Sequence, residues 1–294
     1  MVARTPPSFV VPRHACDCHT HVFGPRTRYP FAPLRSYTPP EASLDELVAL
    51  QRALHLDRVV IVQPSVYGTD NSCTVDALRG LDGRGRAVAV IDETISAAEL
   101  DALHRAGVRG VRVNLATAGV RDPDVARRRL IAAAARVAPL NWHVQVYTEL
   151  AVVAALQHEM AALPAPLVID HFGGARAAAG PGQPGFAALL ALVADGKTYL
   201  KLSAPYRSSS QRPDYADVAA LAKALIVANP ERMLWGSDWP HPGGGRQPDQ
   251  PLEEIEEFFP EDDGRNFNLL ADWAADPRIR HKILVDNPAL LYDF

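Results

Sequence analysis

Short apolar runs alternate with longer amphipathic segments along nearly the whole chain. Runs that are apolar almost throughout, rich in Val, Ile and Leu, are typical of parallel strands buried on both faces. We predict strands at residues 14–22, 57–65, 86–93, 107–115, 143–148, 167–172, 198–206 and 233–241. Ala/Leu-rich segments between these runs predict helices, among them 43–55, 96–107 and 124–138. The first of these helices opens on Ser43 and Glu46, which form a capping-box pattern.

This alternation favours a (β/α)8 TIM barrel, because eight strand–helix units close a barrel. An open, doubly wound sheet is the rival fold, but no Gly-rich phosphate turn follows any of the early strands. The chain contains no internal repeat or long linker, so we expect one domain over residues 1–294. The Pro/Gly-rich segments 173–185 and 240–251 are expected to be long loops at the rim of the barrel.

Composition narrows the class of protein. The 294 residues are 48% hydrophobic and 22% charged, which is usual for a soluble globular enzyme. A net charge of −4 argues against a nucleic-acid partner, and no apolar run approaches the roughly 20 residues that cross a bilayer. Prolines interrupt the first fifteen residues, where a secretory signal would be continuously apolar. We therefore expect a cytoplasmic protein without a membrane partner, with a homo-oligomer as one option.

The segment "ACDCHTHVFGP", residues 15–25, places two histidines one residue apart on the first predicted strand. Alternate residues of a strand share a face, so we expect Asp17, His19 and His21 on one face. Cys16 and Cys18 would then lie on the other face, against the surrounding helices. Two imidazoles at this spacing can bind a metal ion or polarise a carbonyl group. A pair of surface histidines is the alternative.

Polar residues interrupt the predicted strands at their carboxyl ends, strand after strand. Active sites of TIM barrels lie at this end, and buried polar groups cost free energy unless they are paired. The sequence therefore predicts a site there. The strand ends contribute His19, His21, Ser65, Arg112, Asn114, Gln145, Tyr147, His171, Ser203, Arg207, Asp238 and His241.

Five segments together resemble the amidohydrolase superfamily. They are "CDCHTHVFGP", "QPSVYGTDN", "GVRGVRVN", "DHFGG" and "LWGSDWPHP", and they span most of the chain. The likeness is to the branch of pyrone-dicarboxylate lactonases and related sugar- and muconolactone hydrolases. It implies that the chain opens a carboxylated lactone and works without a cofactor.

The resemblance also implies a role for each matching residue. His19, His21 and His171 would stabilise the oxyanion that develops on the lactone carbonyl. Asp238 would deprotonate the attacking water. Arg112 and Arg207 would anchor a substrate carboxylate. Further substrate contacts would come from Tyr37, Ser65, Tyr147 and Asn114.

The chain departs from the pyrone-dicarboxylate pattern at two arginines. Gly174 stands where that branch has one arginine, and "NLATAGVRD", residues 114–122, lacks the other at the matching place. Arg121 and Arg176 are the nearest replacements. A lactone with one carboxylate, or a sugar lactone, therefore fits this chain better than a dicarboxylate.

Metal use is the second open point. Binuclear members of the superfamily need a lysine or glutamate on the fourth strand and a histidine on the fifth. This chain has Arg112 and Gln145 near those ends. One zinc ion could be held by His19, His21, His171 and Asp238. We favour metal-free catalysis, because the positive charge of Arg112 opposes a divalent cation.

Other functions remain as alternatives to lactone hydrolysis. The same residues could serve a zinc-dependent decarboxylase of an aromatic or muconate-type acid, or a lactone isomerase. A carboxylate-binding barrel without catalytic activity is the least favoured, because a binder needs no aspartate among three histidines.

Overall fold

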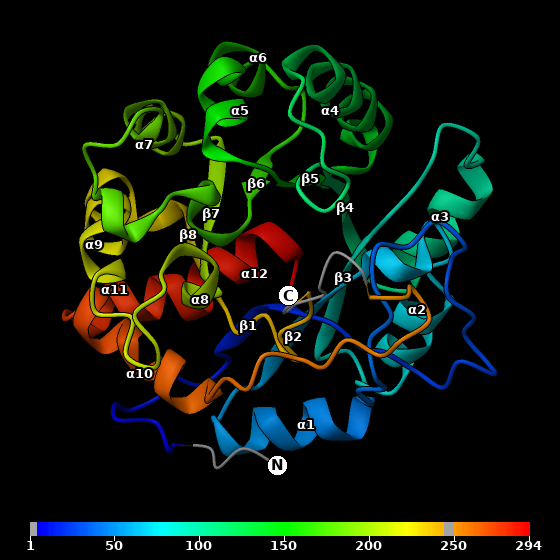
Figure 1. Ribbon diagram of the computed structural model, residues 1–294, viewed down its shortest axis with the longest axis horizontal. Coiled ribbons are helices and arrows are strands. Elements are labelled where there is room, and N and C mark those ends of the chain that lie inside the picture. The colour runs from blue at the N-terminus through cyan, green and yellow to red at the C-terminus, as the bar shows by residue number, and fades with distance from the viewer. Residues whose placement is uncertain (1–4, 244–249) are drawn as a thin grey trace.

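The computed structural model describes residues 5–243 and 250–294, and these residues contain the predicted barrel. Eight parallel strands follow one another in the order β1 to β8, which confirms the (β/α)8 architecture. In Figure 1 the strands lie in the centre and the helices form the layer around them. The strands are β1 (Cys16–Thr20), β2 (Arg58–Val62), β3 (Gly85–Ala89), β4 (Val108–Asn114), β5 (His143–Tyr147), β6 (Leu167–Ile169), β7 (Thr198–Ser203) and β8 (Met233–Gly236).

The helices cover the outside of the barrel, and the three predicted by range are present as α1, α3 and α4. Ser43 and Ser96 begin α1 and α3 with complete capping boxes. None of the helices in the described part of the chain is long and apolar enough to cross a membrane. The helices are α1 (Leu44–Ala53), α2 (Ser72–Arg79), α3 (Ala97–Arg105), α4 (Pro123–Val137), α5 (Leu150–Ala155), α6 (Gln157–Ala161), α7 (Phe186–Ala194), α8 (Pro205–Ser208), α9 (Val218–Ala228), α10 (Asp263–Trp273), α11 (Pro277–His281) and α12 (Asn287–Tyr292).

The predicted rim loops differ in how much of each is described. Segment 173–185 contains two short 3-10 turns and leads directly into α7. Of segment 240–251, residues 244–249 lie outside the described residues.

Backbone hydrogen bonds and one buried carboxylate close the barrel between β1 and β8. The Asp238 N–H donates to the His19 carbonyl, and the His21 N–H donates to the Trp239 carbonyl, both at 2.8 Å. The Asp17 carboxylate accepts from the Ser237 N–H at 2.9 Å and from the His19 N–H at 3.1 Å. The carboxyl ends of β1 and β8 are therefore fixed to each other through Asp17.

The expectation that Cys16 and Cys18 face the helices is wrong. Both thiols pack in one buried cluster with Val60, Val168 and Leu234, which come from three other strands, so this cluster fills the barrel interior. The register of β1 against β2 shifts between Asp17 and Thr20, as in a β-bulge. The extra residue breaks the strict alternation of faces, so His19 and Cys18 both point inward.

We expect Asp17→Ala to lower the free energy of unfolding by roughly 2–4 kcal/mol, because two buried N–H groups lose their acceptor. Urea denaturation of both proteins measures the difference. Asp195→Ala is the matched control, since Asp195 is exposed at the end of α7 and should change stability by less than about 0.5 kcal/mol. Equal losses in the two variants would contradict the importance of this junction.

Candidate active site

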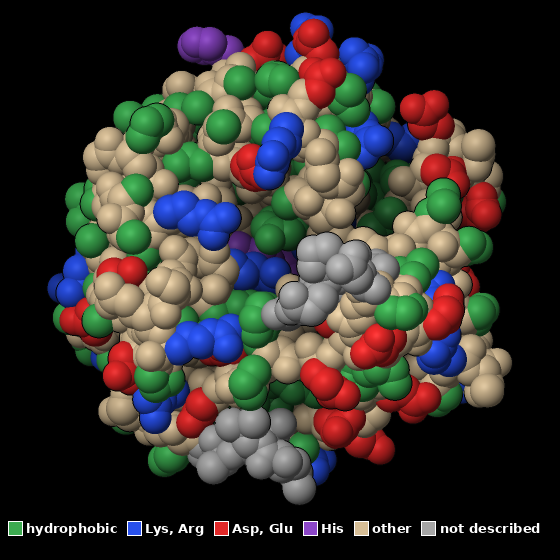
Figure 2. All heavy atoms as spheres, viewed as in Figure 1, with side chains coloured by type: hydrophobic (Ala, Val, Ile, Leu, Met, Phe, Trp, Pro, Cys, Tyr) green, Lys and Arg blue, Asp and Glu red, His purple; other side chains and the backbone are tan. Residues whose placement is uncertain are grey.

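A cavity of about 600 Å³ opens at the carboxyl ends of the strands. Figure 2 shows the hollow near the centre of this face, with basic and histidine side chains at its bottom. Four of the residues predicted at the strand ends are buried and do not line the cavity. They are His19, Gln145, Ser203 and His241. The lining includes His21, Tyr37, Ser65, Arg112, Asn114, Tyr147, His171, Arg207 and Asp238.

Asp238 follows β8 and uses its two carboxylate oxygens differently. Its Oδ2 accepts from the Tyr206 hydroxyl at 2.5 Å and from the Arg207 Nε at 2.9 Å. Its Oδ1 is buried and has no hydrogen-bond partner among the described residues. One oxygen therefore holds the carboxylate in place while the other stays available at the cavity floor.

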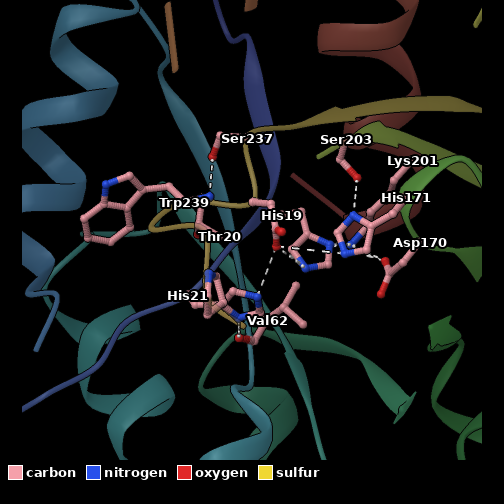
Figure 3. A network of polar contacts seen from close by, with 12 residues as sticks. His19, Thr20, His21, Val62, Asp170, His171, Lys201, Ser203, Ser237 and Trp239 are labelled. Atoms are coloured by element: carbon pink, nitrogen blue, oxygen red, sulfur yellow. Dashed lines mark hydrogen bonds and ion pairs between the residues drawn. The ribbon is translucent and has the colours of Figure 1, made fainter. Parts of the chain in front are cut away.

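Three imidazoles surround that available oxygen. The Nε2 atoms of His19 and His21 each lie 3.4 Å from the Asp238 Oδ1, and the Nε2 of His171 lies 3.9 Å away. Figure 3 shows the three rings converging from β1 and from the end of β6. A water molecule or a polarised carbonyl at this point would contact several of these atoms at once.

The second ring nitrogen of each histidine fixes its orientation. The His21 Nδ1 lies 2.7 Å from the Val62 carbonyl, which can only accept a hydrogen bond. The neutral His21 ring therefore carries its proton on Nδ1 and presents a lone pair at Nε2. The His171 Nδ1 lies 2.8 Å from the Ser203 hydroxyl, which can either donate or accept.

Sequence reasoning missed Lys201 and Asp170, which lie behind His19. The fully buried Lys201 ammonium donates to the Gln145 Oε1 at 2.7 Å and contacts the His19 Nδ1 at 3.1 Å. The Asp170 Oδ2 accepts from the Gln145 Nε2 at 3.0 Å. A signal was available, because a lysine at an inward position of an apolar strand is rare unless it is paired.

Burial and charge set the protonation states of the site. Burial alone would raise the pKa of Asp238, but the charge of the Arg207 guanidinium outweighs it and holds that pKa well below its usual range. Burial lowers the pKa of His21, and it lowers the pKa of His171 to about 4. At neutral pH the site therefore combines an ionised carboxylate with neutral imidazoles.

Two of these residues have backbone conformations that side chains rarely adopt. His171 has a φ of 49° and Asp238 a φ of 65°, both in the left-handed region. Such strain persists only where the surrounding structure enforces it, and it is concentrated at functional sites. The strands on either side hold both turns, so each side chain leaves the strand end toward the cavity.

Two arginines lie over the Tyr147 ring. The guanidinium carbon is 5.7 Å from the ring centre for Arg112 and 5.8 Å for Arg207. The Arg112 Nη2 lies 3.4 Å from Asp170, and its buried Nε has no partner among the described residues. Arg207 has fewer free donors, because its Nε donates to Asp238 and its Nη2 donates to the Pro242 carbonyl at 2.7 Å. Arg112 is therefore the better available anion contact.

The structure shows what stands at the two places, Gly174 and segment 114–122, where the chain lacks the arginines of the pyrone-dicarboxylate pattern. A Cβ at Gly174 would lie 2.8 Å from the Thr148 carbonyl oxygen, so this backbone position does not accept a side chain without a shift. Arg176 lines the cavity instead, and its Nη1 donates to the Arg207 carbonyl at 2.9 Å. Arg121 is exposed and does not line the cavity, but it forms an ion pair with Glu149, which does.

By distance alone, the same side chains could hold one zinc ion. Ligand atoms of His19, His21 and Asp238 lie within 4.8 Å of one another, as do those of His19, Asp170 and His171. The His19 Nε2 and the Asp238 Oδ1 have no hydrogen-bond partner among the described residues, and zinc prefers nitrogen and oxygen ligands of this kind. A bound zinc would polarise a carbonyl or activate a water molecule.

A TIM barrel with histidines on β1 and after β6 and an aspartate after β8 defines an enzyme class with a hydrolytic type of site. The sequence pattern of the amidohydrolase family matches residues 16–294. The chain therefore belongs to the amidohydrolase family.

Individual relatives cover almost the whole chain. A 2-pyrone-4,6-dicarboxylate hydrolase of Comamonas testosteroni is 37% identical over 97% of this chain and 92% of its own length. A 4-sulfomuconolactone hydrolase of Rhizobium radiobacter is also 37% identical, over 99% of this chain and 94% of its own. Among solved structures, a putative 2-pyrone-4,6-dicarboxylic acid hydrolase of Pseudomonas putida is 32% identical, with a TM-score of 0.78, and the match covers 96% of this chain and 98% of that one.

Proposed function

We propose that the chain hydrolyses the ester bond of a small carboxylated lactone without requiring a metal ion. The observation that carries this proposal is the Asp238 Oδ1, which is ionised, has no partner among the described residues, and lies 3.4 Å from the Nε2 atoms of both His19 and His21. The two relatives named above, which are hydrolases of lactones by name, supply the substrate class.

Asp238 and His21 would hold the attacking water. The Asp238 Oδ1 and the lone pair of the His21 Nε2 are both acceptors, so one water molecule can donate a hydrogen to each. Its oxygen lone pair would then face the lactone carbonyl. Tyr206 and Arg207 prevent the carboxylate from rotating, because both donate to Oδ2. Asp238 is thus placed to take a proton as the water attacks.

The reaction balances without a cofactor. The water oxygen bonds to the carbonyl carbon, one water proton passes to Asp238, and the carbonyl oxygen becomes an oxyanion. His19 and His171 lie beside this position and would stabilise the negative charge. The ring C–O bond then breaks, and the proton returns from Asp238 to the leaving oxygen. As that bond breaks, the oxyanion re-forms the carbonyl of a carboxylic acid. The leaving oxygen becomes a hydroxyl group, or an enol where it was bonded to a ring double bond.

The cavity favours a substrate with few anionic groups. Arg112 has a buried Nε without a partner among the described residues, so it is the first anchor for a carboxylate, with Arg176 at the rim as a second contact. Arg207 would mainly hold the Asp238 carboxylate in place.

The cysteines bear on where the enzyme works. Cys16, Cys18 and Cys73 are free, buried thiols, which is consistent with the proposal that the enzyme works in the reducing cytoplasm.

Metal-free catalysis is proposed from the charges around the site. The carboxylate that a zinc ion would use already pairs with the Arg207 guanidinium, and the Lys201 ammonium lies 3.1 Å from the His19 Nδ1. These fixed cations oppose the entry of a divalent cation. Dialysis against a chelator is therefore expected to leave lactone opening unchanged.

Asp238→Asn tests the function directly. On a panel of carboxylated lactones followed by acid release, we expect kcat to fall by roughly 10²–10⁴-fold, because the amide cannot accept the water proton. Running the reaction in heavy-oxygen water should place the label in the product carboxylate. An unlabelled, rearranged lactone would indicate isomerisation instead. Release of carbon dioxide from an aromatic acid, lost on chelation, would indicate the zinc-dependent decarboxylase.

Arg112→Met tests substrate anchoring. Arg105→Met, at an exposed position of α3 outside the cavity lining, is the matched control. Loss of a charged hydrogen bond costs roughly 1.5–3 kcal/mol, so kcat/KM should fall by about 10- to 100-fold for carboxylated lactones. For an uncharged lactone of the same ring the change should be much smaller. The proposal of a carboxylate anchor fails if both variants behave alike.

The pH dependence follows from the shifted pKa values. The pKa of His171 is lowered to about 4, so its neutral form persists down to that pH. As the pH falls through about 4, His171 gains a proton, pairs with the Asp238 carboxylate and weakens it as a base. We expect kcat/KM to stay level between neutral pH and about 5 and to fall near 4. A loss centred near 6.5, the ordinary histidine value, would contradict these protonation states.

A further inference from the structure

We propose that Lys201 is a positioning residue that keeps the proton of His19 on Nε2, so that His19 donates a hydrogen bond into the site and does not serve as a metal ligand. The position of the proton is argued from geometry alone. The catalytic use of that proton rests on the proposed lactone hydrolysis.

Lys201 forms hydrogen bonds with two side chains inside the barrel. It lies on β7, and its side chain is fully buried inside the barrel. Its Nζ contacts the Gln145 Oε1 at 2.7 Å, the His19 Nδ1 at 3.1 Å and the Asp170 Oδ1 at 3.5 Å. An ammonium has donors and no acceptor, so the hydrogen bond between the Lys201 Nζ and the His19 Nδ1 requires the Nδ1 to accept.

Asp170 is the competing partner of the same ring nitrogen. Its Oδ1 lies 3.3 Å from the His19 Nδ1, and a carboxylate in this place would accept a proton from Nδ1 if the two were aligned. The two atoms are not aligned as a hydrogen bond, and the Asp170 Oδ1 accordingly has no hydrogen-bond partner among the described residues. Lys201 does form a hydrogen bond with this nitrogen. The Nδ1 therefore accepts, and the proton of the neutral ring is on Nε2.

His19 and His21 then present opposite polarity to one oxygen. The His19 Nε2 lies 3.4 Å from the Asp238 Oδ1 and carries a proton, whereas the His21 Nε2 lies at the same distance and carries a lone pair. The first can donate to an oxyanion or to a water oxygen, and the second can only accept. A protonated Nε2 has no lone pair for a metal ion, so the two-histidine pair is incomplete as a zinc site while Lys201 donates.

The wild-type protein tests the proton position without any assay of activity. In protein labelled with 15N-histidine, long-range 15N–1H correlation spectra near pH 7 distinguish protonated from unprotonated ring nitrogens. His19→Gln identifies the His19 signals by their loss. We expect a protonated Nε2 and an unprotonated Nδ1 for His19, and the reverse for His21. A proton on the His19 Nδ1 would overturn the inference.

Lys201→Met tests the cause and the consequence. Methionine fills a similar volume without a donor, so the His19 proton can move to Nδ1 and bond to Asp170. We expect the 15N pattern of His19 to reverse and kcat to fall by roughly 10²-fold with little change in KM, as for loss of an oxyanion donor. Lys223→Met, at an exposed position of α9, is the control and should change neither. An unchanged His19 pattern in a folded Lys201→Met protein would overturn the role of Lys201.

Zinc affinity gives a second readout in the same proteins. Lys201→Met removes a nearby positive charge and frees the His19 Nε2, so the zinc dissociation constant should fall on the order of tenfold or more relative to wild type. Equal or weaker zinc binding by the variant would overturn the inference. Failure of the wild type to open any lactone, with the expected 15N pattern, would refute the proposed function and leave the proton assignment standing.

Discussion

The geometry of the site depends on the Asp17 carboxylate, which binds backbone N–H groups on both sides of the β1–β8 junction. It holds the His19 backbone against the turn that carries Asp238. The bulge in β1 lies in the same stretch and turns His19 inward beside Cys18. Two strands that are distant in sequence thereby place the His19 imidazole 3.4 Å from the Asp238 carboxylate. Flexible loops would not hold the two groups at so constant a distance.

Asp238 shows how one side chain can be both fixed and reactive. Tyr206 and Arg207 both donate hydrogen bonds to Oδ2, and the charge of Arg207 keeps the carboxylate ionised. A strongly lowered pKa makes a carboxylate a weaker base, and the site compensates by excluding donors from Oδ1. Neutral imidazoles then meet an anion in a region of low dielectric, where their dipoles act more strongly than they would in water.

The sequence predicted the barrel, the strand order and the residues that meet at the cavity, because apolar periodicity and polar strand ends are local signals. It did not predict the inward position of Cys18. The bulge depends on how β1 pairs with β2, and the alternation of residues along β1 does not reveal it. Lys201 and Asp170 were missed because their partners are distant in sequence. The pairing of Arg207 with Asp238 was missed for the same reason. From the sequence alone, an arginine at the cavity could bind either a substrate carboxylate or a carboxylate of the protein.

The close approach of Gly174 to the Thr148 carbonyl also constrains how the family's specificities can interconvert. An arginine at this point would require the 148–150 backbone to move, since a Cβ at Gly174 would also lie 3.0 Å from the Leu150 N and 3.2 Å from the Glu149 Cα. A single codon change would therefore be harmful before it was useful. Adaptation to new ring acids is more accessible through Arg176 and its neighbours on the rim, where side chains can lengthen into open space. At this turn the course of the main chain, and not only the choice of side chain, decides whether an arginine can be accommodated.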